Sequence, residues 1–180
     1  MKWNYIRLGD IEESQYDELY LKLTPKRKKY IDKMKLQEDK KRSLAAEILL
    51  YRLLEKEFGI KNVLLCREES GKPYLCDSEL YVSISHCDDI AVCAVDTTPL
   101  GIDIERIKDI NDALIERVCT DEEKQYVLGG DFKKRFFEIW TKKEAYFKKQ
   151  GTGITNFKSV NVLSLSFFYL ELEDYIIAII

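Results

Sequence analysis

Two acidic residues interrupt an apolar strand near the middle of the chain. The stretch LGIDIERIK, from Leu100 to Lys108, has the pattern of a buried β-strand, but it includes Asp103 and Glu105. Side chains two positions apart in a strand point to the same face, so these carboxylates are expected to lie about 7 Å apart. Neighbouring carboxylates repel each other unless a cation lies between them. The spacing therefore indicates a cation site.

A third carboxylate occurs later, in the stretch WTKKEAYFKKQGTGI, which begins at Trp140. On a helix, Trp140, Glu144 and Lys148 share one face. Taken alone, Glu144 and Lys148 also fit an ordinary ion pair on a helix surface. Together with Asp103 and Glu105, however, Glu144 would form an all-oxygen site. Such a site suits Mg²⁺, which commonly binds phosphate oxygens as well.

A phosphate ligand requires cations, and the sequence provides a cluster of them. The segment Thr24–Arg42 holds nine basic and three acidic residues. A solvated helical face explains most of these lysines. The only histidine, His86, follows Ser85 at the end of a predicted strand. A single histidine is compatible with a structural role, but at a strand end it could also donate to a phosphate.

These residues need helices and strands to position them, and periodicity together with turn residues predicts the elements. The predicted strands are Trp3–Leu8, Val63–Cys66, Leu80–Ser85, Ile90–Asp96, the LGIDIE segment, Val160–Leu163, Ser166–Glu171 and Tyr175–Ile180. The predicted helices are Glu13–Leu23, one that begins at Thr24-Pro25, Glu38–Phe58, one opened by the capping box Thr120–Glu123, and Phe132–Lys149.

The order of these elements repeats. A long helix that ends at glycine leads in each half into a hairpin, and ISHCDDIAVCAV resembles LELEDYIIAII. Chance similarity is the alternative explanation. An internal duplication predicts an α+β fold of two similar α/β lobes related by a pseudo-twofold axis. We place the lobes at residues 1–98 and 99–180, with the site in a cleft between them, where ligands often bind.

Composition excludes several classes of protein. The chain has 180 residues and a formal net charge of −3, which argues against a nucleic-acid binder or a membrane-surface protein. The first residues lack the apolar core of a signal peptide. Five cysteines without a C-x-x-C spacing favour reduced thiols over a disulfide framework or a zinc site. A cytoplasmic protein is therefore expected.

The two acidic motifs together resemble the signature of the 4′-phosphopantetheinyl transferases, of the two-lobed type that activates surfactin synthetase. The motif GIDIE is followed at the family's distance by WTKKEAYFK. The motifs GKP, SISH and the basic helix that contains Arg42 also occur in the family's order. The resemblance extends from about Thr24 to Ile154.

The resemblance implies a set of roles for individual residues. Asp103, Glu105 and Glu144 would hold Mg²⁺ on the pyrophosphate of coenzyme A, and Glu144 and Lys148 would be the catalytic residues. The residues expected to bind coenzyme A are Arg27, Arg42, Gly71, Lys72, Pro73, Ser85, His86, Asp103 and Lys148, with Gly71-Lys72-Pro73 beside the adenine. The family transfers the phosphopantetheine arm to a serine of an acyl or peptidyl carrier protein and releases 3′,5′-ADP.

The sequence departs from the family pattern at two places. Tyr30, next to Lys29, takes the position of a second basic residue that would meet a phosphate. Only about 26 residues follow Ile154, so the second lobe is expected to be trimmed. A silent paralogue that binds only coenzyme A or a carrier protein is the alternative to an enzyme. Because both lobes lie in one chain, we expect a monomer.

Overall fold

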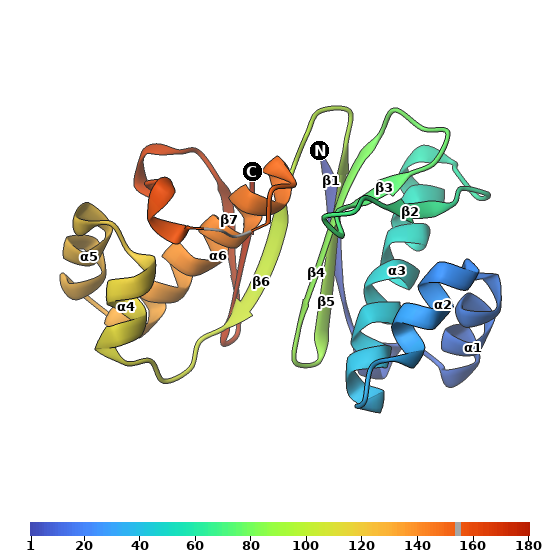
Figure 1. Ribbon diagram of the computed structural model, residues 1–180, viewed down its shortest axis with the longest axis horizontal. Coiled ribbons are helices and arrows are strands. Elements are labelled where there is room, and N and C mark those ends of the chain that lie inside the picture. Colours follow the sequence, from blue (N-terminus) through green and yellow to red (C-terminus); the bar gives the residue numbers. More distant parts are fainter. Residues whose placement is uncertain (154–155) are drawn as a thin grey trace.

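The computed structural model describes residues 1–153 and 156–180, which form two α/β halves arranged side by side (Figure 1). The first half contains β1 (Lys2–Arg7), α1 (Glu13–Lys22), α2 (Pro25–Asp32), α3 (Gln37–Phe58), β2 (Leu65–Arg67), β3 (Pro73–Leu75), β4 (Tyr81–Cys87) and β5 (Ile90–Asp96). The second half contains β6 (Ile102–Arg106), α4 (Asp112–Val118), α5 (Asp121–Leu128), α6 (Phe132–Gln150), β7 (Phe168–Leu172) and β8 (Tyr175–Ile179). Short 3-10 turns lie at Leu8–Asp10, Phe157–Ser159 and Val162–Ser164.

The two halves have the same sheet topology. Their strand orders are β1-β5-β4 and β6-β8-β7, and all pairs are antiparallel. In each half, a hairpin with a two-residue turn follows the long helix, and the first strand pairs with the second strand of that hairpin. The turn residues Asp88 and Glu173 occupy matching positions with φ of 47° and 54°. The topology thus has the repeat that the sequence pattern predicted.

The helices lie outside and the sheets face each other between them (Figure 1). Strand β5 is buried on both faces. Its residues Ala91, Cys93 and Val95 pack in the core beneath α3, whereas Val92 and Ala94 pack in a second core between the sheets. In β8 the same alternation places Ile176 in the core beneath α6, whereas Tyr175, Ile177 and Ile179 pack between the sheets. A continuous apolar run is what strands covered on both faces require.

The capping residues mark most helix ends as predicted. Thr120 and Glu123 form the capping box of α5, and the Thr24 hydroxyl accepts a bond from the Arg27 N–H at the start of α2. Helices α3 and α6 both end before a glycine with left-handed φ, Gly59 and Gly151. The sequence predicted the end of α6 one residue earlier.

Three local predictions were incomplete or wrong. The segment predicted as strand Val160–Leu163 instead contains the 3-10 turn Val162–Ser164, because the side chain of Asn161 accepts a bond from the backbone N–H of Leu163. The short strand β3 and the helix α4 were not predicted. Residues Ile154 and Thr155, the first of which ends the stretch WTKKEAYFKKQGTGI, lie outside the described residues.

Candidate active site

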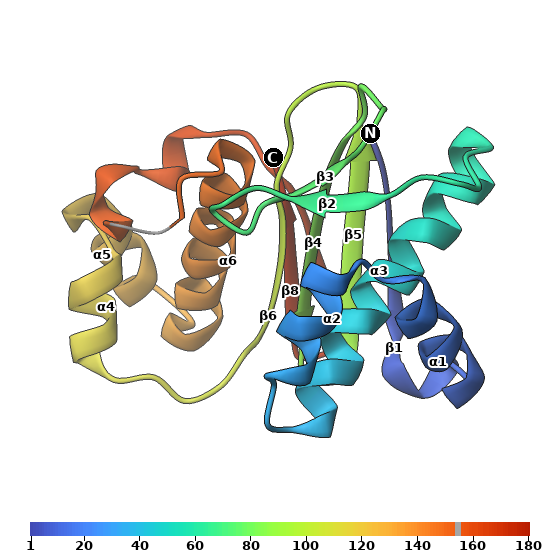
Figure 2. The same cartoon turned by 45° about the vertical axis from the view of Figure 1, so that its right-hand side comes forward.

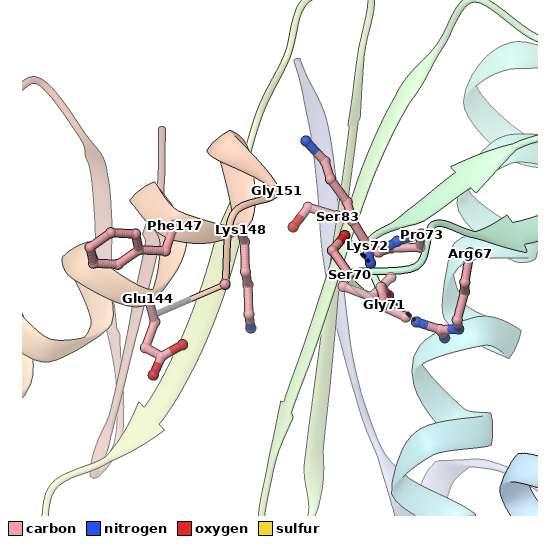
Figure 3. Close-up of a pocket in the computed structure, with 12 residues that line it drawn as sticks. Arg67, Ser70, Gly71, Lys72, Pro73, Ser83, Glu144, Phe147, Lys148 and Gly151 are labelled. Carbon is pink, nitrogen blue, oxygen red and sulfur yellow. Dashed lines mark hydrogen bonds between the residues drawn. The ribbon is translucent and has the colours of Figure 1, made fainter. Parts of the chain in front are cut away.

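A cavity of about 310 Å³ lies between the two halves. Glu144 and Lys148, with Phe147 beside them, line it from α6 (Figure 3). The opposite wall comes from the first half, from the segment between β2 and β3 and from β4. Its lining residues are Arg67, Ser70, Gly71, Lys72, Pro73, Ser83 and Ile84. The cavity therefore lies between the WTKKEAYFK motif of α6 and the GKP motif of the first half.

Gly101 allows β6 to approach α6 closely enough to share this site. A Cβ atom at position 101 would overlap the backbone oxygen of Ala145 and would lie 2.7 Å from the backbone nitrogen of Lys149. No larger residue fits there without separating the strand from the helix. The glycine of the GIDIE motif thus brings the β6 carboxylates next to the C-terminal turns of α6.

Asp103 is the most buried acid of the site, with 3% of its surface exposed. Its Oδ1 accepts bonds from Lys148 Nζ at 2.6 Å and from the Ser85 hydroxyl at 2.7 Å. Lys148 Nζ also donates to Ser85 Oγ at 2.7 Å. The other oxygen, Oδ2, is buried and has no hydrogen-bond partner among the described residues. A buried carboxylate oxygen without a donor is costly unless a ligand binds it.

Glu105 lies on the same strand face as Asp103, as the alternation predicted. Its Oε1 accepts a bond from Trp140 Nε1 at 3.1 Å, so the tryptophan of the α6 motif orients this carboxylate. Burial and then the negative charge of Asp103 raise the pKa of Glu105 above its usual value. The same causes, in the same order, raise the pKa of Glu144 to about 7, although Lys148 opposes the shift. These acids therefore repel one another in the absence of a further cation.

The donor set fits a divalent cation bound through oxygen. Asp103 has one free buried oxygen, and Glu105 and Glu144 both gain from a positive charge nearby. Carboxylate oxygens are the ligands that Mg²⁺ prefers. Within residues 1–153 and 156–180, however, no three His, Cys, Asp or Glu side chains are grouped closely enough to hold a metal ion as they stand. Lys148 instead supplies the positive charge beside Asp103.

The β2–β3 segment reaches across to the second half (Figure 2). Lys72 Nζ donates to the backbone oxygen of Lys149 at 2.6 Å. This oxygen belongs to the last turn of α6, where backbone carbonyls lack helical partners and favour a cation. The Lys72 side chain packs over Gly151, where an added Cβ would lie 2.9 Å from Lys72 Cδ. Gly71, Lys72 and Pro73 therefore form the cavity wall opposite α6, which we call the GKP wall.

The predicted phosphate-binding residues occupy two different places. Desolvation, and then the positive charges of both Lys148 and Arg42, lower the pKa of His86. The Nε atom of Arg42 is buried and has no partner among the described residues. Arg27, by contrast, is held in a buried ion pair with Glu47 at 2.6 Å. Its guanidinium is thus already bound within the first half.

Sequence reasoning missed Arg67 and Glu47. Arg67 lines the cavity, and its NH2 donates to Glu47 Oε1 at 2.9 Å. A pairing between a helix residue and a strand residue 20 positions later leaves no periodic signal in the sequence. The only available hint was the position of Arg67 just before the GKP motif.

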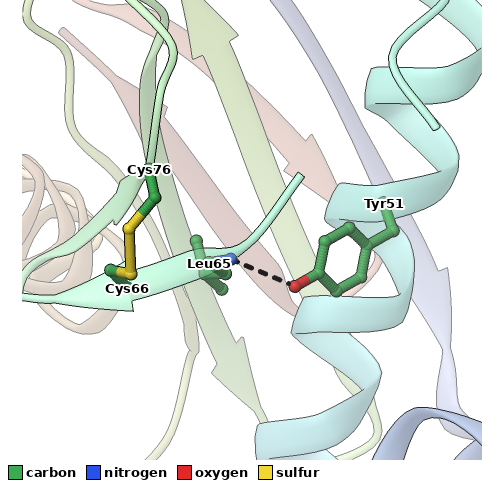
Figure 4. Close-up of a disulfide and its surroundings, with 4 residues drawn as sticks. All are labelled: Tyr51, Leu65, Cys66 and Cys76. Atoms are coloured by element: carbon green, nitrogen blue, oxygen red, sulfur yellow. Dashed lines mark hydrogen bonds between the residues drawn. A yellow bond between two sulfur atoms is a disulfide. The ribbon is translucent and has the colours of Figure 1, made fainter. Parts of the chain in front are cut away.

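A disulfide corrects the prediction of five reduced thiols. Cys66 of β2 and Cys76, which follows β3, are bonded with a Cα–Cα distance of 6.1 Å (Figure 4). The antiparallel pairing of β2 with β3 brings the two cysteines together. Beside them, the Leu65 N–H donates to the Tyr51 hydroxyl of α3 at 3.3 Å. Of the five cysteines, all within residues 1–153, the remaining three are free.

The fold and the site together define a two-lobed α+β protein with carboxylates and basic side chains beside the cavity between its halves. Comparison with known proteins identifies its family. Residues 11–98 match the model described as "4'-phosphopantetheinyl transferase, N-terminal", and residues 99–174 match that of the 4'-phosphopantetheinyl transferase superfamily. The chain belongs to the 4′-phosphopantetheinyl transferase family.

Individual relatives agree with this assignment. The chain is 36% identical over 121 residues to 4'-phosphopantetheinyl transferase gsp of Aneurinibacillus migulanus, which covers 64% of this chain and 51% of that protein. It is 26% identical to Sfp of Bacillus subtilis strain 168, over 74% of this chain and 62% of Sfp. It is 30% identical to HetI of Nostoc sp. strain PCC 7120, over 85% of this chain and 70% of HetI.

The chain spans about half the length of gsp, so the match concerns a part of that relative. None of the described helices is both long enough and apolar enough to cross a membrane.

Proposed function

We propose that the chain transfers the 4′-phosphopantetheine arm of coenzyme A to a serine of an acyl or peptidyl carrier protein and releases 3′,5′-ADP. The observation that carries this proposal is the unpartnered buried oxygen of Asp103, with Glu105, Glu144 and Lys148 around it and the GKP wall opposite. Relatives named as 4′-phosphopantetheinyl transferases support it. The two family models meet at residues 98 and 99, which supports a lobe boundary there.

The basic residues would bind the phosphates of coenzyme A. Lys148, which donates to Oδ1 of Asp103, would contact the pyrophosphate, and Arg42 and His86 would meet the other phosphate groups. The Arg42 Nε, buried and unpaired among the described residues, provides a donor for such a contact. Gly71, Lys72 and Pro73 would contact the adenine end. Charge-assisted bonds of this kind are among the stronger contacts available to a protein.

Asp103, Glu105 and Glu144 would hold Mg²⁺, which when bound offsets the negative charge of the pyrophosphate. In the transfer, the serine oxygen forms a bond to the phosphorus that carries the pantetheine arm, and the bond from that phosphorus to the bridging oxygen breaks. The leaving group is 3′,5′-ADP. Glu144 would accept the serine proton, directly or through a water molecule. Lys148 would stabilise the charge that develops on the leaving group.

The carrier protein would dock at the exit of α6. Lys148, Lys149 and Lys158 lie along this part of the chain, near Glu144 in sequence, and would attract an acidic helix. The glycines Gly151 and Gly153 both have positive φ and let the backbone turn tightly beside the cavity. We further propose that the protein is a monomer, because one chain supplies both walls of the cavity.

Mass spectrometry tests the proposed reaction directly. Apo carrier proteins from fatty-acid, polyketide and nonribosomal-peptide synthesis are incubated with the protein, Mg²⁺ and coenzyme A. A gain of one phosphopantetheine arm on a serine is the expected result. Binding of coenzyme A without any such gain on the carriers tried would favour a silent paralogue instead.

A further inference from the structure

Glu47 is a buried acid on α3 that joins two arginines from different elements. Only 2% of its side chain is exposed. Its Oε1 lies 2.6 Å from NH2 of Arg27 on α2 and 2.9 Å from NH2 of Arg67 on β2. A buried carboxylate is stable only when paired, and here one negative charge serves two positive ones. The three side chains together carry a charge of +1.

The two arginines differ in how firmly they are held. Arg27 is 10% exposed and also donates to the Ser43 hydroxyl at 2.6 Å. Arg67 is 26% exposed, lines the cavity, and has a second bond only to the backbone oxygen of Gly71, at 3.3 Å. Figure 3 shows Arg67 on the first-half wall, with its guanidinium toward Gly71. Arg67 is therefore the guanidinium that can move if the trio is disturbed.

The electrostatics explain what Glu47 does for Arg67. Both guanidiniums bond to the same carboxylate oxygen, so they lie close enough to repel each other. The pKa of Arg27 shows this balance: burial lowers it, the charge of Arg67 lowers it further, and the charge of Glu47 raises it. Without the carboxylate, repulsion would drive the less buried Arg67 toward solvent.

We propose that Glu47 is a positioning residue that holds the Arg67 guanidinium at the cavity wall, where it contacts a phosphate at the nucleotide end of coenzyme A. This inference rests on the proposed function for the identity of the ligand. Glu47 itself lies behind Arg67 and touches no substrate. Its effect reaches the ligand only through the arginine.

Calorimetric titration of coenzyme A and of 3′,5′-ADP tests this role without any carrier protein. Glu47→Gln keeps the shape of the side chain and removes its charge. We expect both ligands to bind about tenfold more weakly, which corresponds to the loss of one charge-assisted contact. Glu55→Gln, an exposed acid on the same helix, is the matched control and should leave both affinities unchanged.

A double-mutant cycle separates positioning from general destabilisation. In an Arg67→Met background the phosphate contact is already lost, so Glu47→Gln should cause no further loss of affinity. An equal loss in both backgrounds, or unchanged or tighter binding in Glu47→Gln alone, would overturn the proposal. So would a loss confined to coenzyme A, because the contact would then lie outside the nucleotide.

Two further outcomes are decisive. If Glu47→Gln does not fold by circular dichroism, Arg67→Met alone must weaken both ligands equally, and unchanged affinity would refute the inference. If the unaltered protein binds coenzyme A but modifies no carrier, the proposed transfer fails while the Glu47 cycle still gives its answer. If it binds neither ligand, both proposals fall.

Discussion

Lys148 of α6 and Asp103 of β6 form an ion pair of 2.6 Å at the boundary between the two halves. Asp103 is buried, whereas the Lys148 side chain is 31% exposed and can reach solvent. The pair leaves Oδ2 of Asp103 without a partner among the described residues. Under the proposed function, that oxygen would bind the cation and Lys148 would contact a phosphate. This arrangement leads to the first of five predictions.

Asp103→Ala should lower carrier modification by about 100-fold or more, because the central oxygen donor for the cation is lost. The fold should persist, since Lys148 can be solvated after its partner is removed. The measurement is the initial rate of carrier modification, with thermal unfolding as a check of the fold. Asp109→Asn is the control, because Asp109 is 92% exposed and lies just after the same strand. Full activity of Asp103→Ala at saturating Mg²⁺ would contradict the assignment.

Gly101→Ala should destabilise the protein severely. The added methyl group would overlap the backbone of α6 at Ala145, and backbone atoms cannot move aside as a side chain can. We expect a loss of about 3 kcal/mol or more in the free energy of unfolding, measured with denaturant. Gly9→Ala is the control, since nothing lies within 4 Å of its added Cβ. Equal stability of the two variants would show that β6 and α6 are further apart.

His86 should titrate below pH 6.5 in the free protein. It is the only histidine, so its imidazole resonances can be followed by NMR without assignment. Partial desolvation and then the charges of Lys148 and Arg42 lower its pKa, whereas a backbone hydrogen bond and Asp39 oppose the shift. Because the folded pKa lies below the unfolded value, this group contributes less stability as the pH falls below about 6.5.

Coenzyme A should raise the His86 midpoint, because a bound phosphate favours the protonated imidazole. Dephospho-coenzyme A, which lacks the 3′-phosphate, serves as the comparison. A midpoint that neither ligand moves would place His86 away from the phosphates.

The disulfide predicts how many cysteines can be alkylated before and after reduction. Alkylation of the unfolded protein without reductant should label three cysteines, and five after reduction, as read by mass spectrometry. Cys66→Ser should lower the free energy of unfolding by about 2–3 kcal/mol, the value for a loop of this length. Adding Cys76→Ser should cost little more. Five labelled thiols in the unreduced protein would restore the original prediction.

Lys158→Glu should raise the KM for carrier protein several-fold and leave the KM for coenzyme A unchanged. The reason is charge: under the proposed function an acidic helix of the carrier docks beside Lys158, and a reversed charge would repel it. Lys56→Glu is the control, because Lys56 is 75% exposed at the far end of α3. A change in the KM for coenzyme A alone would show that the carrier docks on another surface.

The sequence was most informative where a local pattern decides the structure. The runs in β5 and β8 are apolar on both faces, and the capping box at Thr120 began its helix as predicted. Asp103 and Glu105 share a strand face because the period of a strand is two residues. These features need no knowledge of distant parts of the chain.

The features that were missed depend on contacts between distant segments. The trio of Glu47, Arg27 and Arg67 forms only when α2, α3 and β2 pack together, and each of these residues alone looks like an ordinary surface charge. The pairing of Cys66 with Cys76 depends on β3, a strand of three residues that is too short to show periodicity. Arg27 is a further example. The family resemblance predicted that it binds a phosphate, but it could not show that Arg27 already forms an ion pair with Glu47.

The order of strands in the two sheets has a consequence for synthesis on the ribosome. β1 pairs with β5 and β6 pairs with β8, so each sheet is completed only by the last strand of its own half. The sheet of the first half can be completed as soon as Asp96, the last residue of β5, has left the ribosome. The GKP wall, with Arg67 and Lys72, has then also been synthesised. The carboxylates of β6, which we propose bind the cation, are fixed in place only when β8 pairs beside them. Under the proposed function, a nascent chain thus completes the GKP wall before it completes the cation site.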